Sequence, residues 1–309
     1  MTDIKTAMDS NTKEDGPSED NGEGIKQEVE RNFFLYFLLF LISYYASYII
    51  PVILFMAFYL LFFGPYFLEN HDFITLFIDL RSLIALLTLP LVILGCYLFR
   101  LFFMALITRI FWSITEKISP TKDGIIPRNL ASKTAKYYHL RSYLIKYPKN
   151  LYRKGAFPWL TNWLYNFIGA SKIGKGTTIE DQLGADRYLN VGKNCYIGVG
   201  GGISSHLVEG IFGNISYFEI KMGDNVTLGG HNLVGPGCEL KDNSYLLPLA
   251  VTTKYNLLKG DNYYWGMPLR RIFRKKIMSY LKLSQEDLDK AEALRKKQVE
   301  LKEIKNGKK

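Results

Sequence analysis

The chain has 309 residues, of which 48% are hydrophobic and 15% aromatic, and its formal net charge is +10. Its three cysteines (Cys96, Cys195 and Cys238) are widely spaced and form no CxxC or Cys/His cluster. Neither a disulfide framework nor a structural zinc site is therefore indicated, and this cysteine usage is typical of a reducing compartment.

The charge is unevenly distributed. Residues 1–32 carry nine acidic and four basic side chains, whereas residues 109–154 carry eleven basic and two acidic ones. A basic run can bind nucleic acid, but no nucleic-acid module accompanies this one. Because the run follows directly on an apolar segment, it favours contact with a membrane surface and no nucleic-acid partner.

The polar, acidic segment 1–31 contains too few large apolar groups to offset the entropy of ordering it. We therefore expect a disordered N-terminal tail. The segment also lacks the basic start and short apolar core of a cleavable signal peptide.

Two long apolar stretches follow, and residues 32–118 are predicted to form a transmembrane hairpin. Phe33–Phe63 contains no charge and is long enough to cross a bilayer once, with Pro51 expected to kink it. Ser82–Phe99 is also uncharged and is expected to continue to Arg109. Arg100 would then either extend to the headgroups or face the first helix.

Charge on the flanks predicts the orientation of the hairpin. The connector 64–81 has three acids and one arginine, while the segment after the second span is strongly basic. Because positive flanks stay on the cytoplasmic side, we expect a cell-membrane protein with two spans and both termini in the cytoplasm. Asp79 and Arg81 fit an interfacial loop, with a functional intramembrane pair as the alternative.

Residues 119–171 are interpreted as a basic junction beside the membrane. Within it, Gly155–Gly169 has apolar side chains at helical spacing: Trp159, Trp163, Leu164 and Phe167. Such a helix either lies flat at the headgroups or caps the domain that follows, and one helix could do both.

From residue 173 a period of six appears. Ten of eleven positions are Ile, Val, Leu or Met, and glycine follows six of them. This period is typical of a coil with three faces, in which each face offers one inward apolar stack and the glycine permits a sharp corner. The inward positions are Ile173, Ile179, Ala185, Val191, Ile197, Ile203, Met222, Leu228, Val234, Leu240 and Leu246.

The period breaks once. Continuing in phase from Ile203 would place Glu209 and Lys221 inside the coil, and the phase resumes one residue late at Met222. Residues 204–221 are therefore expected to leave the coil as an excursion, the kind of loop in which function tends to reside.

These residues carry a resemblance. The sequence SSH followed by a loop, then KMGDNVTLGGHNLVGPGCELKDNSYLLPLAVT and WGMPLRR, resembles the hexapeptide-repeat acyltransferases of the galactoside and serine acetyltransferase type. It is closer still to the membrane-embedded C-terminal units of poly-lysine-synthetase-like enzymes. The resemblance covers residues 155–275 and, in outline, the two spans. It implies a left-handed parallel β-helix over 172–271, thioester chemistry and a homotrimer.

The same resemblance places the catalytic histidine of the family at His206, at the start of the excursion. Imidazole has a pKa suited to a general base. Glu209 could orient the ring, as a carboxylate orients histidine in a triad. His231, at a later corner, is interpreted as structural.

No tightly bound cofactor is expected, and acyl-CoA or a carrier-protein thioester would be the co-substrate. The resemblance places the coenzyme A phosphates near four cations that we expect to follow the last coil: Lys254, Lys259, Arg270 and Arg271. The glycine-rich run 198–202 lacks the strand-to-helix context and lysine of a phosphate loop, so it is read as a corner.

An acyltransferase acting on a small-molecule, lipid or peptide acceptor is the function favoured. A non-catalytic, membrane-anchored scaffold or binding module is the alternative. A zinc enzyme is a third, but it needs three converging histidines and the repeat domain has only two. Residues 272–309 are predicted to form a charged C-terminal helix, with Ser284 and Asp287 at a start resembling a capping box.

Overall fold

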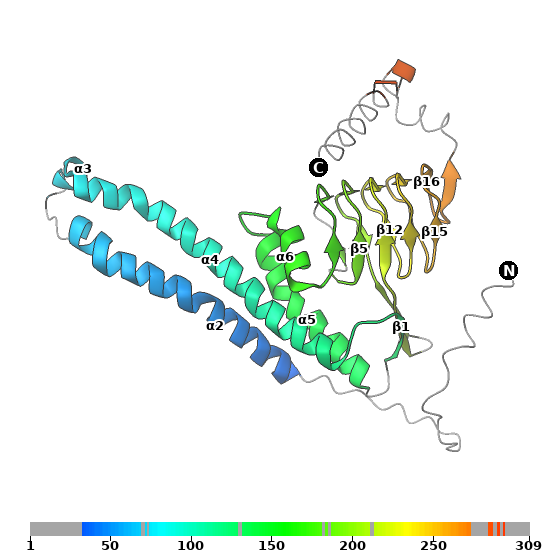
Figure 1. Cartoon of the computed structure of the whole chain (residues 1–309), viewed down its shortest axis with the longest axis horizontal. Coiled ribbons are helices and arrows are strands. Elements are labelled where there is room, and N and C mark those ends of the chain that lie inside the picture. Colours follow the sequence, from blue (N-terminus) through cyan, green and yellow to red (C-terminus); the bar gives the residue numbers. More distant parts are fainter. Residues whose placement is uncertain are drawn as a thin grey trace, which may run out of the picture.

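The computed structural model describes residues 33–68, 72, 74–128, 132–180, 183–184, 187–210 and 213–272, and isolated positions between 284 and 293. Two long apolar helices extend away from a stack of short strands, and two shorter helices lie where they meet (Figure 1). The expected N-terminal tail and most of the expected C-terminal helix lie outside the described residues.

The apolar helices are longer than the uncharged runs suggested. Helix α2 (Phe33–Phe58) contains Pro51 and continues as a π-helix, η1 (Tyr59–Leu68). After the short α3 (Thr75–Ile78), helix α4 (Leu80–Ile118) continues nine residues beyond Arg109. Since i→i−4 hydrogen bonding does not require a membrane, a helix can extend beyond the uncharged part of its sequence.

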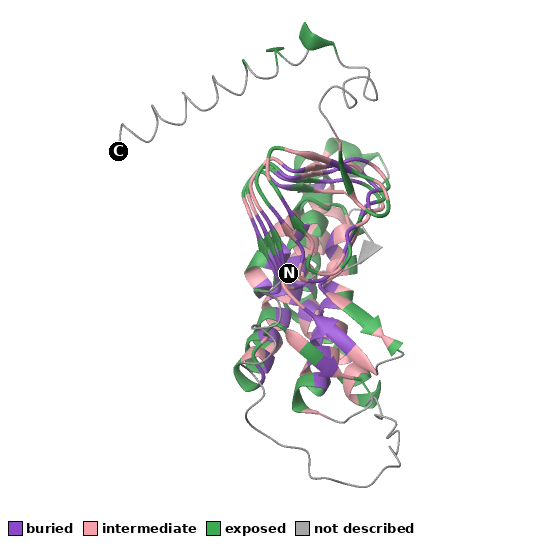
Figure 2. Ribbon diagram, turned by 90° about the vertical axis from the view of Figure 1, so that its right-hand side faces the viewer, coloured by how far each residue is buried: buried purple, intermediate pink, exposed green. Residues whose placement is uncertain are grey.

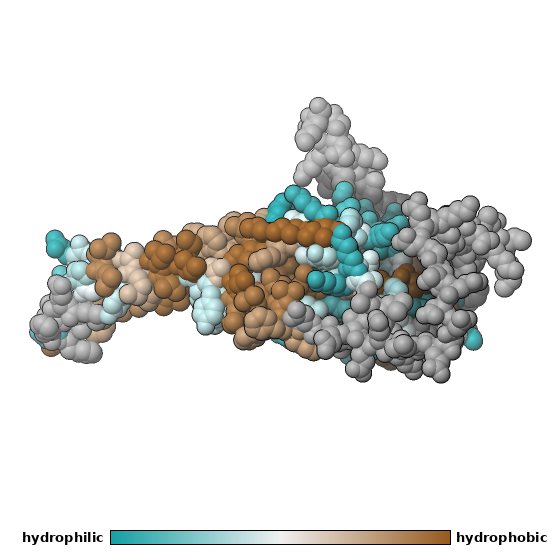
Figure 3. All heavy atoms as spheres, turned by 90° about the horizontal axis from the view of Figure 1, so that it is seen from below, coloured by the Kyte–Doolittle hydropathy of each residue, from teal (hydrophilic) through white to brown (hydrophobic). Residues whose placement is uncertain are grey.

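Both helices are long and apolar enough to cross a membrane. They span Phe33–Phe67 and Leu80–Ile118, each with a mean hydropathy of 2.3 in its most apolar stretch, of which only 17% and 11% are buried. Figure 3 shows an apolar surface along much of their length. A core helix of a soluble protein would instead bury most of these side chains.

Arg100 faces the first apolar helix, one of the two placements expected for it. Its guanidinium lies 4.1 Å from the ring centroid of Tyr48 in α2, and its Nη2 donates to the Tyr147 hydroxyl at 2.9 Å. Asp79 caps α4, with its carboxylate accepting from the Ser82 amide at 2.9 Å. An N-cap carboxylate at a helix end accounts for Asp79 without an intramembrane pair.

The junction contains a long helix that the sequence did not reveal, α5 (Lys133–Arg153), capped by Ser132. Its Arg141 is buried and donates to the carbonyls of Thr115 and Ser119 at the end of α4, at 3.1 and 2.7 Å. Glu116 lies 3.4 Å from the same guanidinium. Arg141 thereby gives a donor to the C-cap carbonyl of Ser119 and a second donor to the Thr115 carbonyl, which also accepts from the Ser119 amide at 3.0 Å.

Helix α6 (Leu160–Ile168) covers the first turn of the strand stack. It ends at Gly169, whose φ of 84° is the left-handed conformation common after a helix. The Asn166 side chain donates to the Ile173 carbonyl at 2.9 Å and accepts from the Ile173 amide at 2.8 Å. These bonds support the capping role that the sequence left open for this helix.

Apart from a small sheet described below, the strands form three sheets that the chain visits in turn. The neighbours within each sheet are parallel, except for an antiparallel last strand, β17. The first sheet holds β2 (Lys172–Ile173), β5 (Leu189–Val191), β10 (Ile220–Met222), β13 (Glu239–Leu240) and β15 (Leu257–Leu258). The second holds β3 (Thr178–Ile179), β6 (Tyr196–Ile197), β11 (Thr227–Leu228), β14 (Tyr245–Leu246), β16 (Tyr263–Trp265) and β17 (Arg270–Ile272), and the third holds β4 (Leu183–Gly184), β7 (Gly202–Ile203) and β12 (Leu233–Val234).

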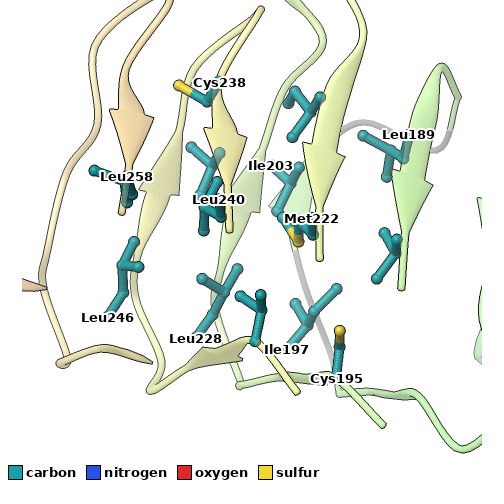
Figure 4. Packing of buried hydrophobic residues seen from close by; sticks show 14 of the residues in the cluster. Leu189, Cys195, Ile197, Ile203, Met222, Leu228, Cys238, Leu240, Leu246 and Leu258 are labelled. Carbon is teal, nitrogen blue, oxygen red and sulfur yellow. The ribbon is translucent and has the colours of Figure 1, made fainter. Parts of the chain in front are cut away.

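The expected inward stacks form the core of this coil. Ile197 pairs in register with Leu228, which pairs with Leu246, and all three are fully buried. Figure 4 shows these side chains and their neighbours pointing into the space between the sheets. Figure 2 shows buried positions alternating with exposed ones around the coil. A six-residue period thus places one apolar side chain per strand inside.

The glycines after the inward residues serve close packing, which corrects the expectation that they make corners. A Cβ on Gly192 would lie 2.4 Å from the carbonyl oxygen of Gly223 in the next turn. One corner is instead made by Asn194, Asn225 and Asn243, with φ between 54° and 57°. Asparagine tolerates this left-handed conformation better than most residues do.

Three details of the repeat differ from the prediction. The excursion ends at residue 219, because Ile220 and Lys221 already belong to β10. Gly184, and not Ala185, pairs with Ile203, and Ala185 itself lies outside the described residues. Leu246 was the last inward position predicted, and strands β15 and β16 add further turns inside the predicted bounds of 172–271. Hydrogen bonding between turns tolerates local shifts in spacing that a strict period of six does not.

The excursion is a β-hairpin that belongs to a small sheet separate from the three sheets of the coil. Strands β8 (His206–Glu209) and β9 (Asn214–Tyr217) pair antiparallel, and β1 (Gly124–Pro127) from the junction adds a third strand beside β9. The hairpin is therefore fixed to the segment that follows the second apolar helix.

Candidate functional site

His206 is the first residue of β8, where the hairpin leaves the coil. The two serines that precede it hold the backbone where the hairpin leaves the coil. The Ser204 hydroxyl donates to the His206 carbonyl at 2.5 Å, and the Ser205 hydroxyl donates to the Arg187 carbonyl at 2.9 Å. The backbone at His206 is thus held by a local hydrogen bond from Ser204, and the preceding Ser205 is bonded to the first turn of the coil.

The same serine influences the imidazole tautomer. Ser204 Oγ lies 3.4 Å from His206 Nδ1. A hydroxyl has one hydrogen, and that of Ser204 is directed at the carbonyl, so its oxygen is left to accept from Nδ1–H. This arrangement favours a neutral ring with its lone pair on Nε2.

A buried arginine lies next to the imidazole. Arg187 is 4% exposed, and its Nη1 donates to the Tyr138 carbonyl at 2.8 Å. Its guanidinium lies 4.2 Å from the ring centroid of Tyr138 and 5.4 Å from that of Tyr217. The His206 ring meets Tyr138 edge to face at 6.0 Å.

These surroundings make His206 hard to protonate. Burial lowers the pKa of His206 to about 4, and the positive charge of Arg187 and the nearby His139 act in the same direction. Both causes penalise the charged ring. The imidazole is therefore neutral at pH 7 and able to accept a proton.

His206 borders a groove of about 690 Å³, which we call the hairpin groove. The groove lies between the start of β8 and the third sheet, and most of its lining is apolar. In addition to His206, its polar side chains include Ser204, Thr253 and Lys254. The remaining lining comes from Gly202, Leu207, Leu233, Val234, Gly235, Pro236, Val251, Thr252 and Tyr255.

Glu209 contacts residues other than His206. Its carboxylate forms an ion pair with Lys254 and accepts from the Ser216 hydroxyl at 2.7 Å. The Lys254 and Ser216 hydrogen bonds hold the pKa of Glu209 below its usual range. These contacts join the hairpin to the last turn of the coil, and Glu209 makes no contact with the imidazole.

The four cations expected at a coenzyme A site do not all line the hairpin groove. Lys254 precedes β15 and Lys259 follows it, so both belong to the coil instead of coming after it. Lys254 lines the hairpin groove. Lys259, Arg270 and Arg271 are not among the residues that line this groove, and both arginines lie on β17.

His231 is exposed at a corner, with a φ of 49°. Its Nδ1 lies 2.5 Å from where a Cβ on Gly200 would be, so the glycine leaves room for the ring. The run 198–202 is accordingly a corner of the coil. Across the described part of the chain, no three His, Cys, Asp or Glu side chains are placed to hold a metal ion.

Sequence reasoning missed Arg187, Tyr138 and Ser204. Arg187 falls between two inward positions, where the period of six predicts nothing about burial. Tyr138 lies 68 positions before His206 in α5, a helix that was not foreseen. A serine two residues before the candidate histidine was visible, but its contact depends on the turn geometry.

No known protein family and no curated protein matches this chain. Solved structures that match include a hexapeptide-repeat acetyltransferase and other acyltransferases. An acetyltransferase of this type from Vibrio cholerae is 19% identical over 35% of this chain and 64% of its own length, with a TM-score of 0.31. The chain thus spans less than two thirds of that protein.

Two further matches have similarly low sequence identities and TM-scores. A maltose O-acetyltransferase from Clostridium difficile is 15% identical over 55% of this chain and 87% of its own, with a TM-score of 0.27. The serine acetyltransferase of Brucella abortus is 14% identical over 55% of both chains, with a TM-score of 0.29. The comparisons give no support to a closer tie with poly-lysine-synthetase-like enzymes.

Proposed function

We propose that the protein is a membrane-anchored acyltransferase that moves an acyl group from a thioester donor to a hydroxyl or amine acceptor. His206 acts as the general base. The strand stack is a left-handed parallel β-helix, and α2 and α4 anchor it in the bilayer as two spans. The donor is acyl-CoA or a carrier-protein thioester, which the sequence resemblance implies.

One observation carries the proposal. A neutral imidazole begins the hairpin that interrupts an otherwise regular coil, and it borders a mostly apolar groove of about 690 Å³. Apolar grooves of this size with a few polar groups are typical of ligand sites.

The proposed step uses the free nitrogen of the ring. His206 Nε2 takes the proton from the acceptor hydroxyl or amine as the acceptor attacks the thioester carbonyl carbon. The tetrahedral intermediate then collapses, the carbon–sulfur bond breaks, and the imidazolium returns its proton to the leaving thiolate. Ser204 holds the ring through Nδ1, and Lys254 offers a positive charge in the same groove for the donor or the developing oxyanion.

Glu209 then acts by holding Lys254 in place, in contrast to the triad-like role first expected for it. Lys259, Arg270 and Arg271 remain candidates for the coenzyme A phosphates, at the end of the coil remote from its first turn. We also propose the homotrimer that the sequence resemblance implies.

The exposed apolar faces of α2 and α4 support the anchor. The basic segment 109–154, which includes α5, follows the second helix directly and would lie on the cytoplasmic side. Acyl-CoA is a large, charged molecule that does not cross a bilayer, so a coil on this side would have access to it.

The proposal is tested by incubating the purified full-length protein with a panel of acyl-CoA donors and an extract of membrane lipids and small amines. Release of free coenzyme A thiol and the mass of the acylated product are measured together. We expect thiol release with at least one donor, matched by an acylated product. Absence of thiol release with every donor, from a folded protein, would favour the non-catalytic scaffold.

A further inference from the structure

A second cavity, of about 560 Å³, lies where α5, α6 and the first turn of the coil meet. It lies apart from the hairpin groove and shares no lining residue with it. Arg153 and Lys154 line it from the end of α5, Thr161 and Asn162 from the first turn of α6, and Glu180 from the segment after β3. Its size suits a small ligand or a lipid headgroup.

Cations outnumber carboxylates among the side chains that line the cavity. Its side chains contribute two cations and one carboxylate, so their sum is one positive charge. Helix α6 has nine residues, and Trp159 at its N-cap makes no side-chain capping bond. The Leu160 and Thr161 amides donate to the Phe157 and Pro158 carbonyls at 3.1 Å. The helix dipole still leaves partial positive charge at this end, which favours an anion.

Thr161 provides independent evidence for a ligand. The residue is 6% exposed, and its hydroxyl has no hydrogen-bond partner among the residues that the structure describes. Buried hydroxyls are nearly always paired, because an unpaired one loses its hydration without compensation. A ligand oxygen in this cavity would supply the partner.

The cavity also lies beside an apolar helix. The Ala156 amide donates to the Tyr97 hydroxyl of α4 at 3.3 Å, and the Phe157 ring lies 5.9 Å from that of Tyr97. Trp159, which lines the cavity, packs on Phe157 and is 68% exposed. Exposed tryptophan near cations is typical of the headgroup region of a bilayer.

We infer that this cavity binds a phosphate ester. The phosphate oxygens accept from the Thr161 hydroxyl, the positive end of α6 lies beside them, and Arg153 and Lys154 balance the charge. Phospholipid headgroups and soluble phosphorylated molecules share this chemistry. The inference is independent of the proposed acyl transfer, because it uses none of the groove residues.

Calorimetry on the full-length protein in phosphate-free maltoside detergent separates the two sources. The probes are dihexanoyl phosphatidic acid, glycerol 3-phosphate and phosphate-free dihexanoylglycerol. Binding of phosphatidic acid alone identifies a lipid ligand, and binding of glycerol 3-phosphate as well identifies a site for the phosphate itself. Equal binding of phosphatidic acid and dihexanoylglycerol, or no binding of either phosphate ester, overturns the inference.

Variants assign the binding to this cavity. We expect Arg153→Gln with Lys154→Gln, and separately Thr161→Val, each to weaken phosphate binding about tenfold or more, since each removes a bond to a charged group. The matched control, Lys133→Gln with Lys136→Gln at the other end of α5, removes the same charge and should leave binding unchanged. Thr161→Val keeps the side-chain shape, so it remains informative if the double variant misfolds. Unchanged affinity in a folded Thr161→Val protein contradicts the inference.

Discussion

At the scale of the residue, the protonation state of His206 decides what the hairpin groove can do. Burial, Arg187 and His139 all disfavour the imidazolium, so the ring is neutral over the physiological range. General bases work best with a pKa near the working pH. An anionic donor in the groove would offset the charge of Arg187 and raise the pKa of His206 toward that range.

Titration of the ring tests this directly. In histidine-labelled protein followed by NMR, we expect His206 to gain its proton only as the pH falls through about 4, whereas an unperturbed histidine titrates near about 6.5. The His206→Ala variant assigns the signal. Arg187→Met should move the midpoint upward, because it removes a like charge. A midpoint near about 6.5 in the wild type would contradict the burial of the ring.

At the scale of the element, the close approach of successive turns explains the repeated glycines. A Cβ on Gly192 would collide with the backbone of the next turn, whereas one on Gly124 meets nothing within 4 Å. Gly192→Ala should therefore destabilise the coil by about 1–3 kcal/mol, the range for overpacked sites. Gly124→Ala should have little effect. Thermal unfolding followed by circular dichroism measures both, and equal midpoints would mean that turns can separate at no cost.

The inward positions of the coil should tolerate substitution as poorly as these glycines do. Ile197 is fully buried, and an unpaired carboxylate in its place lacks both water and a cation. Ile197→Asp is expected to cost about 3–5 kcal/mol, enough to unfold the coil. Lys193→Asp, at an exposed position two residues before Cys195, should be tolerated. Limited proteolysis compares them, and similar resistance in the two variants would refute the inward assignment.

The coil could be predicted because its signal is local and repeated. At positions such as Ile197 and Leu228 the apolar residue type, the six-residue period and the following glycine all agree. In the structure these two residues are paired in register on neighbouring strands. The site was only partly predictable. His206 could be found from the break in the repeat, but Arg187 and Tyr138 meet it through tertiary packing, which leaves no periodic trace in the sequence.

At the scale of the whole molecule, α5 links the apolar helices to the candidate site. Its Tyr143 stacks on Tyr36 of α2 at 4.1 Å, and its Tyr138 packs against His206. The hairpin is further tied to β1, which follows α4. The groove is thus held at a fixed place relative to the two helices.

If α2 and α4 span the bilayer, the protein should stay in the membrane pellet after extraction with high salt and with carbonate, because the apolar surface and not charge retains it. Protease added outside intact cells should leave residues 110–309 uncut. Release by salt alone would contradict the two spans, and cleavage of the coil from outside would reverse the orientation.

The most direct measurement of the central claim follows the transfer of an isotope-labelled acyl group from acyl-CoA in membranes that contain the wild type, His206→Ala or His231→Ala. Mass spectrometry quantifies the labelled product, and the amount of folded protein is matched between samples. Loss of a positioned base costs about 10²–10⁴ in rate, so we expect transfer to disappear in His206→Ala and to persist in His231→Ala. Transfer at a near wild-type rate in His206→Ala would contradict the assignment of this histidine as the base.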